Sequence, residues 1–187
     1  MKIVIDIDGT IIYSIEMLIN IYNKFNEDKL IYNQNHNWDL YPIVKNDKER
    51  KELFKYFDYK DFYNNPLFTY GARDVINKLS KKHEVIICSK HNESRKPVTT
   101  KFINECFPNC KLIFVDDFED KCLIPCDMII DDKIECIKKS LAKFKICFGN
   151  YDWNKNWDGS RYTNWNDIEQ LVRIMDIIVE GDNKYEI

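Results

Sequence analysis

Lys2-Ile-Val-Ile-Asp-Ile-Asp-Gly-Thr10 is the stretch that decides the fold. After Lys2, the run is apolar and β-branched with no polar alternation before the first acid, which is typical of a central strand covered on both faces. Gly9 follows, where glycine turns the chain without steric cost. The sequence therefore predicts that the chain opens with a buried strand at residues 2–7 and that two aspartates stand at its carboxyl end.

Similar apolar runs recur along the chain. Four of them predict strands, at residues 83–88, 111–115, 127–130 and 144–148. Helical patterns alternate with these strands, at residues 72–80, 97–106, 134–142 and 165–179. Asn164 or Asn166 could cap the last helix. This alternation indicates an α/β fold, a parallel sheet flanked by helices. Ligands of such folds bind beyond the carboxyl ends of the strands.

The segment from about residue 11 to residue 70 breaks the alternation. It is rich in Asn, Lys, Tyr and Phe, with helical stretches near residues 14–26 and 47–57 and no obvious strand. An insertion of this size after the first strand predicts a small helical cap over the strand ends. We expect residues 1–12 and 68–187 to form the core and residues 13–67 to form the cap.

The bulk composition limits the classes of function. The chain has 187 residues and a net charge of -3, with 44% hydrophobic and 32% charged residues. That length allows a core that buries roughly 70% of the surface exposed by the unfolded chain. The negative net charge gives no reason to expect a surface that binds polyanions. No run approaches the ~20 apolar residues of a membrane span, and the N-terminus lacks the pattern of a signal peptide. We expect a cytoplasmic globular protein with neither a membrane nor a nucleic-acid polymer as partner.

Seven cysteines, an odd number without a secretion signal, predict reduced thiols. Cys106/Cys110 and Cys122/Cys126 form two C-x3-C pairs of the kind that can bind zinc. The tighter two-residue spacing of zinc knuckles is missing, and Cys106 lies in a predicted helix. Ordinary buried cysteines are therefore the favoured interpretation.

Asp6 and Asp8 are the first candidates for chemistry. They stand two residues apart at a strand end, so both side chains can approach the same side of the sheet edge. Two carboxylates this close repel each other and need a bound cation, a shared proton, or both. Mg²⁺ fits, since it takes carboxylates, main-chain carbonyls, waters and phosphate oxygens. Taken alone, the motif could also be an acidic turn that caps a helix.

A second acidic pair, Asp131 and Asp132, ends the apolar run that begins at Asp127. Adjacent acids at the end of a buried strand are costly unless a cation or hydrogen-bond donors compensate them. In a parallel sheet this strand end can lie beside the first, and so supply a third carboxylate to the same ion. The alternative is an acidic helix start that the helix dipole favours.

Two weaker signals complete the set. Ser89 ends the second predicted strand, where a hydroxyl and nearby main-chain N–H groups can hold a phosphoryl oxygen. Lys121 stands six residues before Asp127, where a lysine can neutralise phosphate and nucleophile. A serine after a strand is more often a cap or turn residue, and most lysines are simply solvated.

The order of these signals resembles the four motifs of the haloacid dehalogenase (HAD) superfamily, and within it the 5′(3′)-deoxyribonucleotidase family. Three further stretches carry the likeness: Phe62 to Ala72 with Val85 to Ser89; Glu119-Asp120-Lys121 through Lys133; and the fifth predicted strand with Tyr162-Thr-Asn-Trp165. The resemblance covers most of the chain. It implies a HAD-like core, a small helical cap after the first strand, and a homodimer.

The resemblance also implies roles for the four acids. Asp6 would attack phosphorus and become an aspartyl phosphate, while Asp8 would serve as acid and then base. Mg²⁺ would be held by Asp6, the main-chain carbonyl of Asp8, and Asp131. Asp132 would contact the ion through a metal-bound water, or would contact a metal ligand rather than the ion itself.

Phosphate contacts are expected from Ser89 and Lys121. The family usually has Thr-Ser where this chain has Ser89-Lys90, so Lys90 is a further substrate-binding candidate that could change the phosphate contacts. The family's extra phosphate-binding lysine would be Lys96 or Lys101.

The predicted cap is unusually aromatic, and nucleobases stack on such rings for ~1–3 kcal/mol each. Its rings belong to Trp38, Tyr41, Phe57, Tyr59, Phe62 and Tyr63. Trp38 and Tyr41, in a loop-like context, are the better candidates for a base contact. For any one ring, the cap's own hydrophobic core is the alternative.

The leading hypothesis is a phosphatase of (deoxy)nucleoside monophosphates, with the bias to deoxy substrates implied by resemblance only. The alternatives are a phosphatase of the same superfamily for a sugar phosphate, and a non-catalytic metal-binding or interaction protein on the same fold. Polynucleotide ends are disfavoured by the acidic charge and the lack of a basic stripe.

Overall fold

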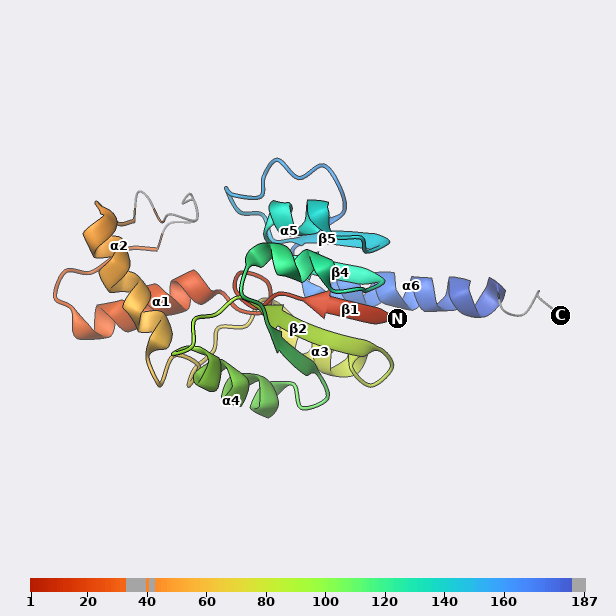
Figure 1. The fold of residues 1–187 in the computed structure, drawn as a ribbon, viewed down its shortest axis with the longest axis horizontal. Coiled ribbons are helices and arrows are strands. Elements are labelled where there is room, and N and C mark those ends of the chain that lie inside the picture. The colour runs from red at the N-terminus through yellow and green to blue at the C-terminus, as the bar shows by residue number, and fades with distance from the viewer. Residues whose placement is uncertain (33–39, 41–42, 183–187) are drawn as a thin grey trace.

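The computed structural model describes residues 1–32, 40 and 43–182 (Figure 1). At its centre lies a sheet of six parallel strands in the order β3-β2-β1-β4-β5-β6. The strands are β1 (Lys2–Ile5), β2 (Glu84–Ser89), β3 (Lys111–Phe114), β4 (Met128–Asp131), β5 (Phe144–Phe148) and β6 (Arg161–Tyr162). The predicted α/β class is confirmed.

The first strand is central because it pairs on both sides. Ile5 lies opposite Ile87 of β2 and Ile130 of β4. Alternate side chains of β1 enter different cores, as strand geometry requires: Ile3 and Ile5 join the large one, and Val4 joins a smaller one on the other face. Because β2 and β4 both run parallel to β1, all three strands end at the same edge of the sheet.

Helices flank this sheet. They are α3 (Ala72–Leu79), α4 (Lys96–Cys106), α5 (Ile134–Lys139) and α6 (Trp165–Asp182), with a 3-10 turn, η2 (Phe118–Leu123), between β3 and β4. Of the two predicted caps for the last helix, Asn164 is the one that acts, because its side-chain oxygen accepts from the main-chain N–H of Asp167 at 3.0 Å. None of the described helices is long and apolar enough to cross a membrane.

The predicted helical insert follows β1. It contains α1 (Ser14–Phe25), α2 (Asp47–Phe54) and the 3-10 turn η1 (Lys55–Asp58). Figure 1 shows these helices on the side of the sheet toward which β1 runs, the side of the strand carboxyl ends. The side chain of Asn46 caps α2 by accepting from Glu49 N at 3.0 Å.

The structure differs from the sequence prediction at several boundaries. β1 ends at Ile5, so Asp6 already lies in the turn, and the helix expected at residues 47–57 splits into α2 and η1. α5 ends at Lys139 rather than residue 142. The two-residue β6 was not predicted, because so short a strand has no periodicity of its own and exists only through its pairing with β5.

The cysteines are unpaired thiols, four of them buried and three partly buried. Burial raises the pKa of Cys122, Cys126 and Cys106, among others, which keeps these thiols in the neutral form. Within the described residues, no group of three or more metal-ligating side chains includes a cysteine.

Candidate active site

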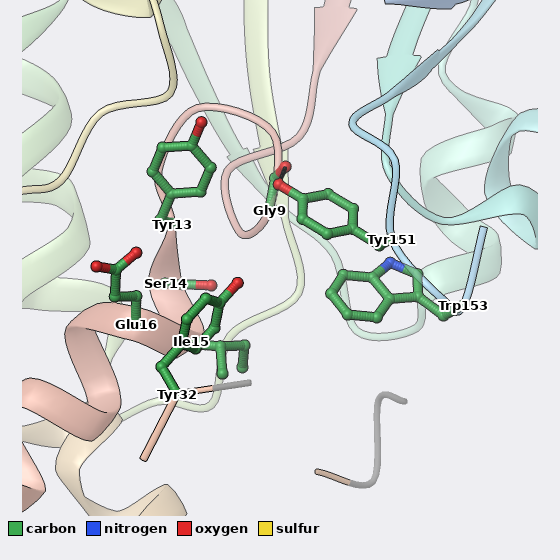
Figure 2. A pocket seen from close by; sticks show the side chains of 8 residues that line it. All are labelled: Gly9, Tyr13, Ser14, Ile15, Glu16, Tyr32, Tyr151 and Trp153. Carbon is green, nitrogen blue, oxygen red and sulfur yellow. Dashed lines mark hydrogen bonds between the residues drawn. The ribbon is translucent and has the colours of Figure 1, made fainter. Parts of the chain in front are cut away.

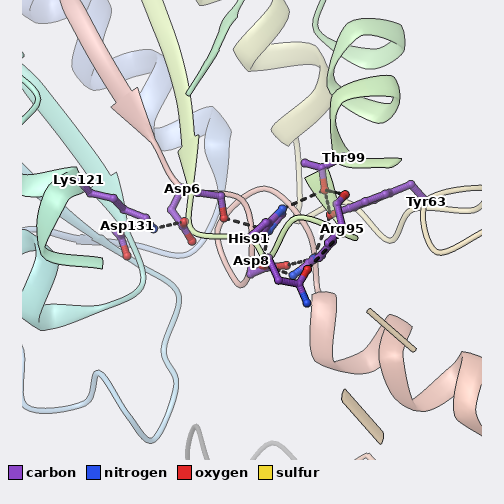
Figure 3. A network of polar contacts seen from close by, with 10 residues as sticks. Asp6, Asp8, Tyr63, His91, Arg95, Thr99, Lys121 and Asp131 are labelled. Atoms are coloured by element: carbon purple, nitrogen blue, oxygen red, sulfur yellow. Dashed lines mark hydrogen bonds and ion pairs between the residues drawn. The ribbon is translucent and has the colours of Figure 1, made fainter. Parts of the chain in front are cut away.

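The strand ends gather a lysine and two aspartates. Asp6 follows β1, and its main-chain N–H donates to Ile130 O of the neighbouring strand at 3.0 Å, which brings it beside Asp131 at the end of β4. Lys121 reaches in from η2, and its Nζ donates to Asp6 Oδ1 and, at 3.2 Å, to Asp131 Oδ2 (Figure 3). All three side chains are at most 5% exposed. Asp131 is further fixed because its Oδ1 accepts from Lys133 N at 2.8 Å.

Asp132 completes a group of carboxylates that suits a metal ion. One oxygen each of Asp6, Asp131 and Asp132 lie within 4.8 Å of one another, and all three residues are buried. One lysine does not balance three buried carboxylates, so the group favours a further cation. Hard oxygen donors in this number are what Mg²⁺ takes from proteins. The residues present therefore fit a magnesium ion.

The electrostatics of the group reflect this excess of negative charge. Burial raises the pKa of Asp6 to about 7, with the neighbouring acids adding to the rise and Lys121 opposing it. Burial, Asp6 and Asp131 likewise raise the pKa of Asp132 well above its usual range. Burial by itself would lower the pKa of Lys121, but Asp131 and Asp6 outweigh it and the lysine stays charged.

Asp8 lies outside this group and is held by two other residues. Arg95, the residue before α4, forms a two-pronged ion pair with it: Nη1 donates to Oδ2 at 2.9 Å and Nη2 donates to Oδ1 at 2.8 Å. His91 Nε2 lies 3.1 Å from Asp8 Oδ2. Burial would raise the pKa of Asp8, but Arg95 and His91 outweigh it and hold that pKa well below its usual range.

Ser89 ends β2 at the same edge of the sheet. It is 3% exposed, and its Oγ lies 3.1 Å from His91 Nε2, so one imidazole connects it to Asp8. Thr99 Oγ1 fixes the other side of that ring, 2.9 Å from Nδ1. The hydroxyl is therefore oriented by a buried network.

These residues share one cavity of about 270 Å³. Its core side is lined by Asp6, Asp8, Ser89, Lys90, Arg95, Phe118, Lys121, Asp131, Asp132 and Lys133. The insert contributes Arg50, Phe54 and Phe57. The cavity thus brings carboxylates, cations and a hydroxyl together under two aromatic rings, a combination suited to a phosphorylated ligand with an apolar or aromatic portion.

A family model described as 5' nucleotidase, deoxy (pyrimidine), cytosolic type C protein (NT5C) matches residues 1–177. The chain belongs to this family. It is a nucleotidase on a HAD fold, which confirms the resemblance inferred from the motifs. No curated protein sequence gives a significant match to it.

Solved structures share the fold of this nucleotidase. A putative HAD hydrolase, YfnB, from Bacillus subtilis, bound to magnesium, aligns with a TM-score of 0.59 at 14% identity, over 91% of this chain and 97% of that one. A HAD-superfamily hydrolase of subfamily IA from Geobacter sulfurreducens aligns with a TM-score of 0.56 at 13% identity, over 91% and 98%. A putative beta-phosphoglucomutase from Bacteroides vulgatus gives 0.52 at 13% identity, over 90% and 86%.

The loop after β5 of the nucleotidase supports the acids in a way that the sequence did not predict. Trp153 Nε1 donates to Asp132 Oδ2 at 2.9 Å, and Asn154 Nδ2 donates to the carbonyl of Asp132 at 3.0 Å. Tyr151 stacks on Trp153 with ring centroids 4.4 Å apart, and its hydroxyl donates to Gly9 O at 2.8 Å. Figure 2 shows these two rings beside Gly9, opposite the first residues of α1. In the sequence, the aromatic residues Tyr151 and Trp153 shortly after a predicted strand were the signal that could have pointed to this loop.

Several predicted ligand contacts lie elsewhere. Lys96 pairs with Glu93 and Lys101 lies 3.9 Å from Glu105, and neither lines the cavity. Trp38 and Tyr41 fall outside the described residues. Among the other aromatic residues of the insert, Phe57 lines the cavity, and Phe62 and Tyr63 are buried near Arg95. His91 and Arg95 were missed, because the polar run in which they lie, Lys90 to Lys96, gives no sign of burial.

Proposed function

We propose that this nucleotidase hydrolyses the phosphate ester of (deoxy)nucleoside monophosphates, with Asp6 as the nucleophile. The observation that carries the proposal is the position of Asp6 at the carboxyl end of the central strand, in contact with Lys121 and beside two further buried carboxylates. A nucleophilic carboxylate must meet an anionic phosphate, so it needs positive charge beside it; Lys121 supplies one such charge, and the three carboxylates together suit a metal cation.

In the first step an oxygen of Asp6 forms a bond to phosphorus as the bond from phosphorus to the sugar oxygen breaks. Asp8, which must first take up a proton because Arg95 and His91 hold its pKa well below the usual range, gives that proton to the leaving oxygen. In the second step water attacks the aspartyl phosphate, Asp8 takes the proton of the water, and inorganic phosphate leaves. Ser89 and Lys121 bind the phosphoryl oxygens throughout, where charge is held in the transition state.

A magnesium ion would be held by Asp6, Asp131 and Asp132, with the main-chain carbonyl of Asp8 as a further candidate ligand. When bound, it supplies positive charge that lets an anionic nucleophile approach an anionic phosphate. Lys121 supplies charge at the same place, and Trp153 holds Asp132 in position through its indole N–H.

The insert would act as the cap, with residues 13–67 covering the core formed by residues 1–12 and 68–187. Phe54 and Phe57 line the cavity from this side and offer ring faces to a nucleobase. Lys90 lines the cavity with its Nζ 4.9 Å from the ring centre of Phe118, which supports it as a substrate-binding residue. The family's cytosolic name supports a cytoplasmic location, and the homodimer stays a prediction.

The test is phosphate release from a panel of 5′- and 3′-(deoxy)nucleoside monophosphates, sugar phosphates and p-nitrophenyl phosphate, with and without a chelator. Asp6→Asn should abolish turnover. Asp127→Asn is the matched control, because Asp127 accepts from Lys2 N at the opposite end of β4 and should be replaceable without loss of activity.

Turnover of nucleotides that falls when the base is removed supports the proposal. Preferential turnover of sugar phosphates would keep the mechanism and discard the substrate. A folded protein that binds magnesium and turns over nothing would refute the catalytic role of Asp6.

A further inference from the structure

Arg95 connects the candidate active site to the insert. Its Nη2 donates to the hydroxyl of Tyr63 at 2.9 Å, and its guanidinium carbon lies 4.3 Å from the ring centre of Phe57 and 5.2 Å from that of Phe62 (Figure 3 shows the pair with Asp8 and Tyr63). The residue is only 6% exposed. A core residue is thus enclosed by side chains of residues 57–63 on one side and by Asp8 on the other.

The pair with Arg95 occupies both oxygens of Asp8. Each oxygen accepts one guanidinium N–H, and Oδ2 also lies in hydrogen-bond range of His91. Both oxygens thus face Arg95, and the guanidinium stabilises them as a carboxylate, without the proton that a leaving group needs. For Asp8 to serve as the acid of the proposed reaction, its pair with Arg95 must open.

A buried guanidinium does not leave a carboxylate unless another anion takes the place of that carboxylate, since an unpaired buried charge costs several kcal/mol. Arg95 lines the same cavity as Ser89 and Lys121, the two residues expected to hold phosphate. Its Nε, moreover, finds no hydrogen-bond partner among the described residues. The planar fork of arginine matches two oxygens of a phosphoryl group as well as it matches a carboxylate.

We propose that Arg95 is a substrate-binding residue that exchanges Asp8 for the phosphoryl group of the substrate, and so releases Asp8 toward the leaving oxygen when phosphate enters. The inference rests on the proposed function and adds a residue to it. Arrival of phosphate, rather than a separate signal, then frees Asp8 to take up from solvent the proton that the first step needs.

The aromatic surroundings of Arg95 suit such an exchange. Ring faces attract a guanidinium without accepting a directed hydrogen bond, so Phe57 and Phe62 can stabilise the group in both positions. Tyr63 follows its movement through the hydrogen bond to Nη2, and its ring stacks on Phe102 of α4 at 4.4 Å. Phosphate binding is thereby transmitted to residues 57–63 of the insert.

The experiment is a double-mutant cycle on the binding of inorganic phosphate, measured by calorimetry in the presence of Mg²⁺ for the full chain, Asp8→Asn, Arg95→Met and the double variant. Freed from its partner, Arg95 should bind phosphate more tightly, so Asp8→Asn should raise the affinity about tenfold or more. In the Arg95→Met background the same Asp8→Asn change should give little gain. Equal gains in both backgrounds would mean that Asp8 merely repels phosphate, and would overturn the inference.

Controls separate binding from folding. Arg95→Lys keeps the charge but loses the fork, and should recover only part of the lost affinity. Arg173→Met, at an exposed arginine of α6, should leave phosphate binding unchanged. Wild-type affinity in a folded Arg95→Met or Arg95→Lys protein would also overturn the inference.

The cycle involves no turnover, so its outcome is independent of the substrate panel. An enzyme that hydrolyses nucleotides but shows no coupling between Asp8 and Arg95 would sink this inference alone. Coupling without nucleotide turnover would support the exchange and sink the substrate assignment.

Discussion

A methyl group on Gly9 would lie 2.4 Å from Oδ2 of Asp132. The turn after β1 therefore packs directly on the acidic pair after β4, with no room for a side chain between them. Gly9 also has a φ of +78°, a conformation that L side chains rarely adopt. The turn that presents Asp6 and Asp8 thus depends on glycine both for its shape and for its contact with Asp132.

Gly9→Ala should weaken magnesium binding and abolish activity. Both losses should be larger than the loss of folding stability accounts for. The strained φ costs about 1–2 kcal/mol of stability, and the added methyl group must displace the carboxylate of Asp132, a candidate metal ligand. Gly71→Ala is the matched control, since Gly71 has a φ of +80° but its added methyl would come no closer than 3.3 Å to Asn166. Melting curves and magnesium titrations of both variants check this. Similar losses of magnesium affinity in the two variants would contradict it.

Lys121→Met should leave the buried carboxylates of Asp6 and Asp131 without their cation. Removal of one partner of a buried ion pair costs about 3–5 kcal/mol, and activity should fall with it because the phosphoryl group loses the same charge. Added Mg²⁺ should restore much of the stability and little of the activity. Lys139→Met, which breaks only an exposed pair with Glu119, should change neither. Denaturant unfolding with and without Mg²⁺ separates the two effects.

Trp153→Phe should weaken magnesium binding without altering the fold. The substitution keeps a ring to stack on Tyr151 but removes the N–H that orients Asp132. Loss of a hydrogen bond that orients a metal ligand typically costs about 10- to 100-fold in affinity. Trp157→Phe is the matched control, because its N–H donates at 3.0 Å to Ser160 O at an exposed site. Calorimetric titration with Mg²⁺ should show the loss in the first variant only.

The strand pattern made the meeting of Asp6 with Asp131 and Asp132 predictable. Parallel strands that end at one edge of the sheet bring Asp6 and Asp131 together there. The apolar pattern of the strands and their order along the chain were therefore enough to predict this pair. The partners of Asp8 could not be predicted in this way. Arg95 and His91 lie in a polar stretch between β2 and α4, and Arg95 is buried by contacts with residues 57–63 and with Asp8, which are distant in the sequence. Which charged residue becomes buried depends on tertiary contacts that no local pattern records.

The same limit applies to the loop after β5. Trp153 and Trp157 stand four residues apart in similar polar surroundings, yet one supports the Asp132 carboxylate of the candidate metal site and the other a loop carbonyl. Their difference arises from the path of the chain between β5 and β6. The pairing of Arg161 with Cys147 fixes that path, and β6 itself is too short to be seen in the sequence.

Magnesium binding should strengthen as the pH rises through neutrality. Burial raises the pKa of Asp6 from 3.8 to about 7 in the metal-free protein, so below pH 7 the ion must displace a proton from its ligand. Affinity should therefore rise most steeply as the pH passes through about 7. The stability of the metal-free protein depends on pH in the opposite sense. An acid with a raised pKa holds its proton in the folded state, so the free energy of unfolding falls as the pH rises from about 4 to about 7. Mg²⁺ should then raise the melting temperature more at pH 8 than at pH 5.5.

Asp6→Asn should lose most of this pH dependence, with a remainder from Asp132, whose pKa burial and its acidic neighbours also raise. The Asp127→Asn variant should keep all of it, since Asp127 lies at the other end of β4. Thermal unfolding of the three proteins at both pH values, with Mg²⁺ and with a chelator, makes the comparison. A magnesium-induced shift of the same size at pH 5.5 and pH 8 in the wild type would show that Asp6 is already ionised before the metal binds.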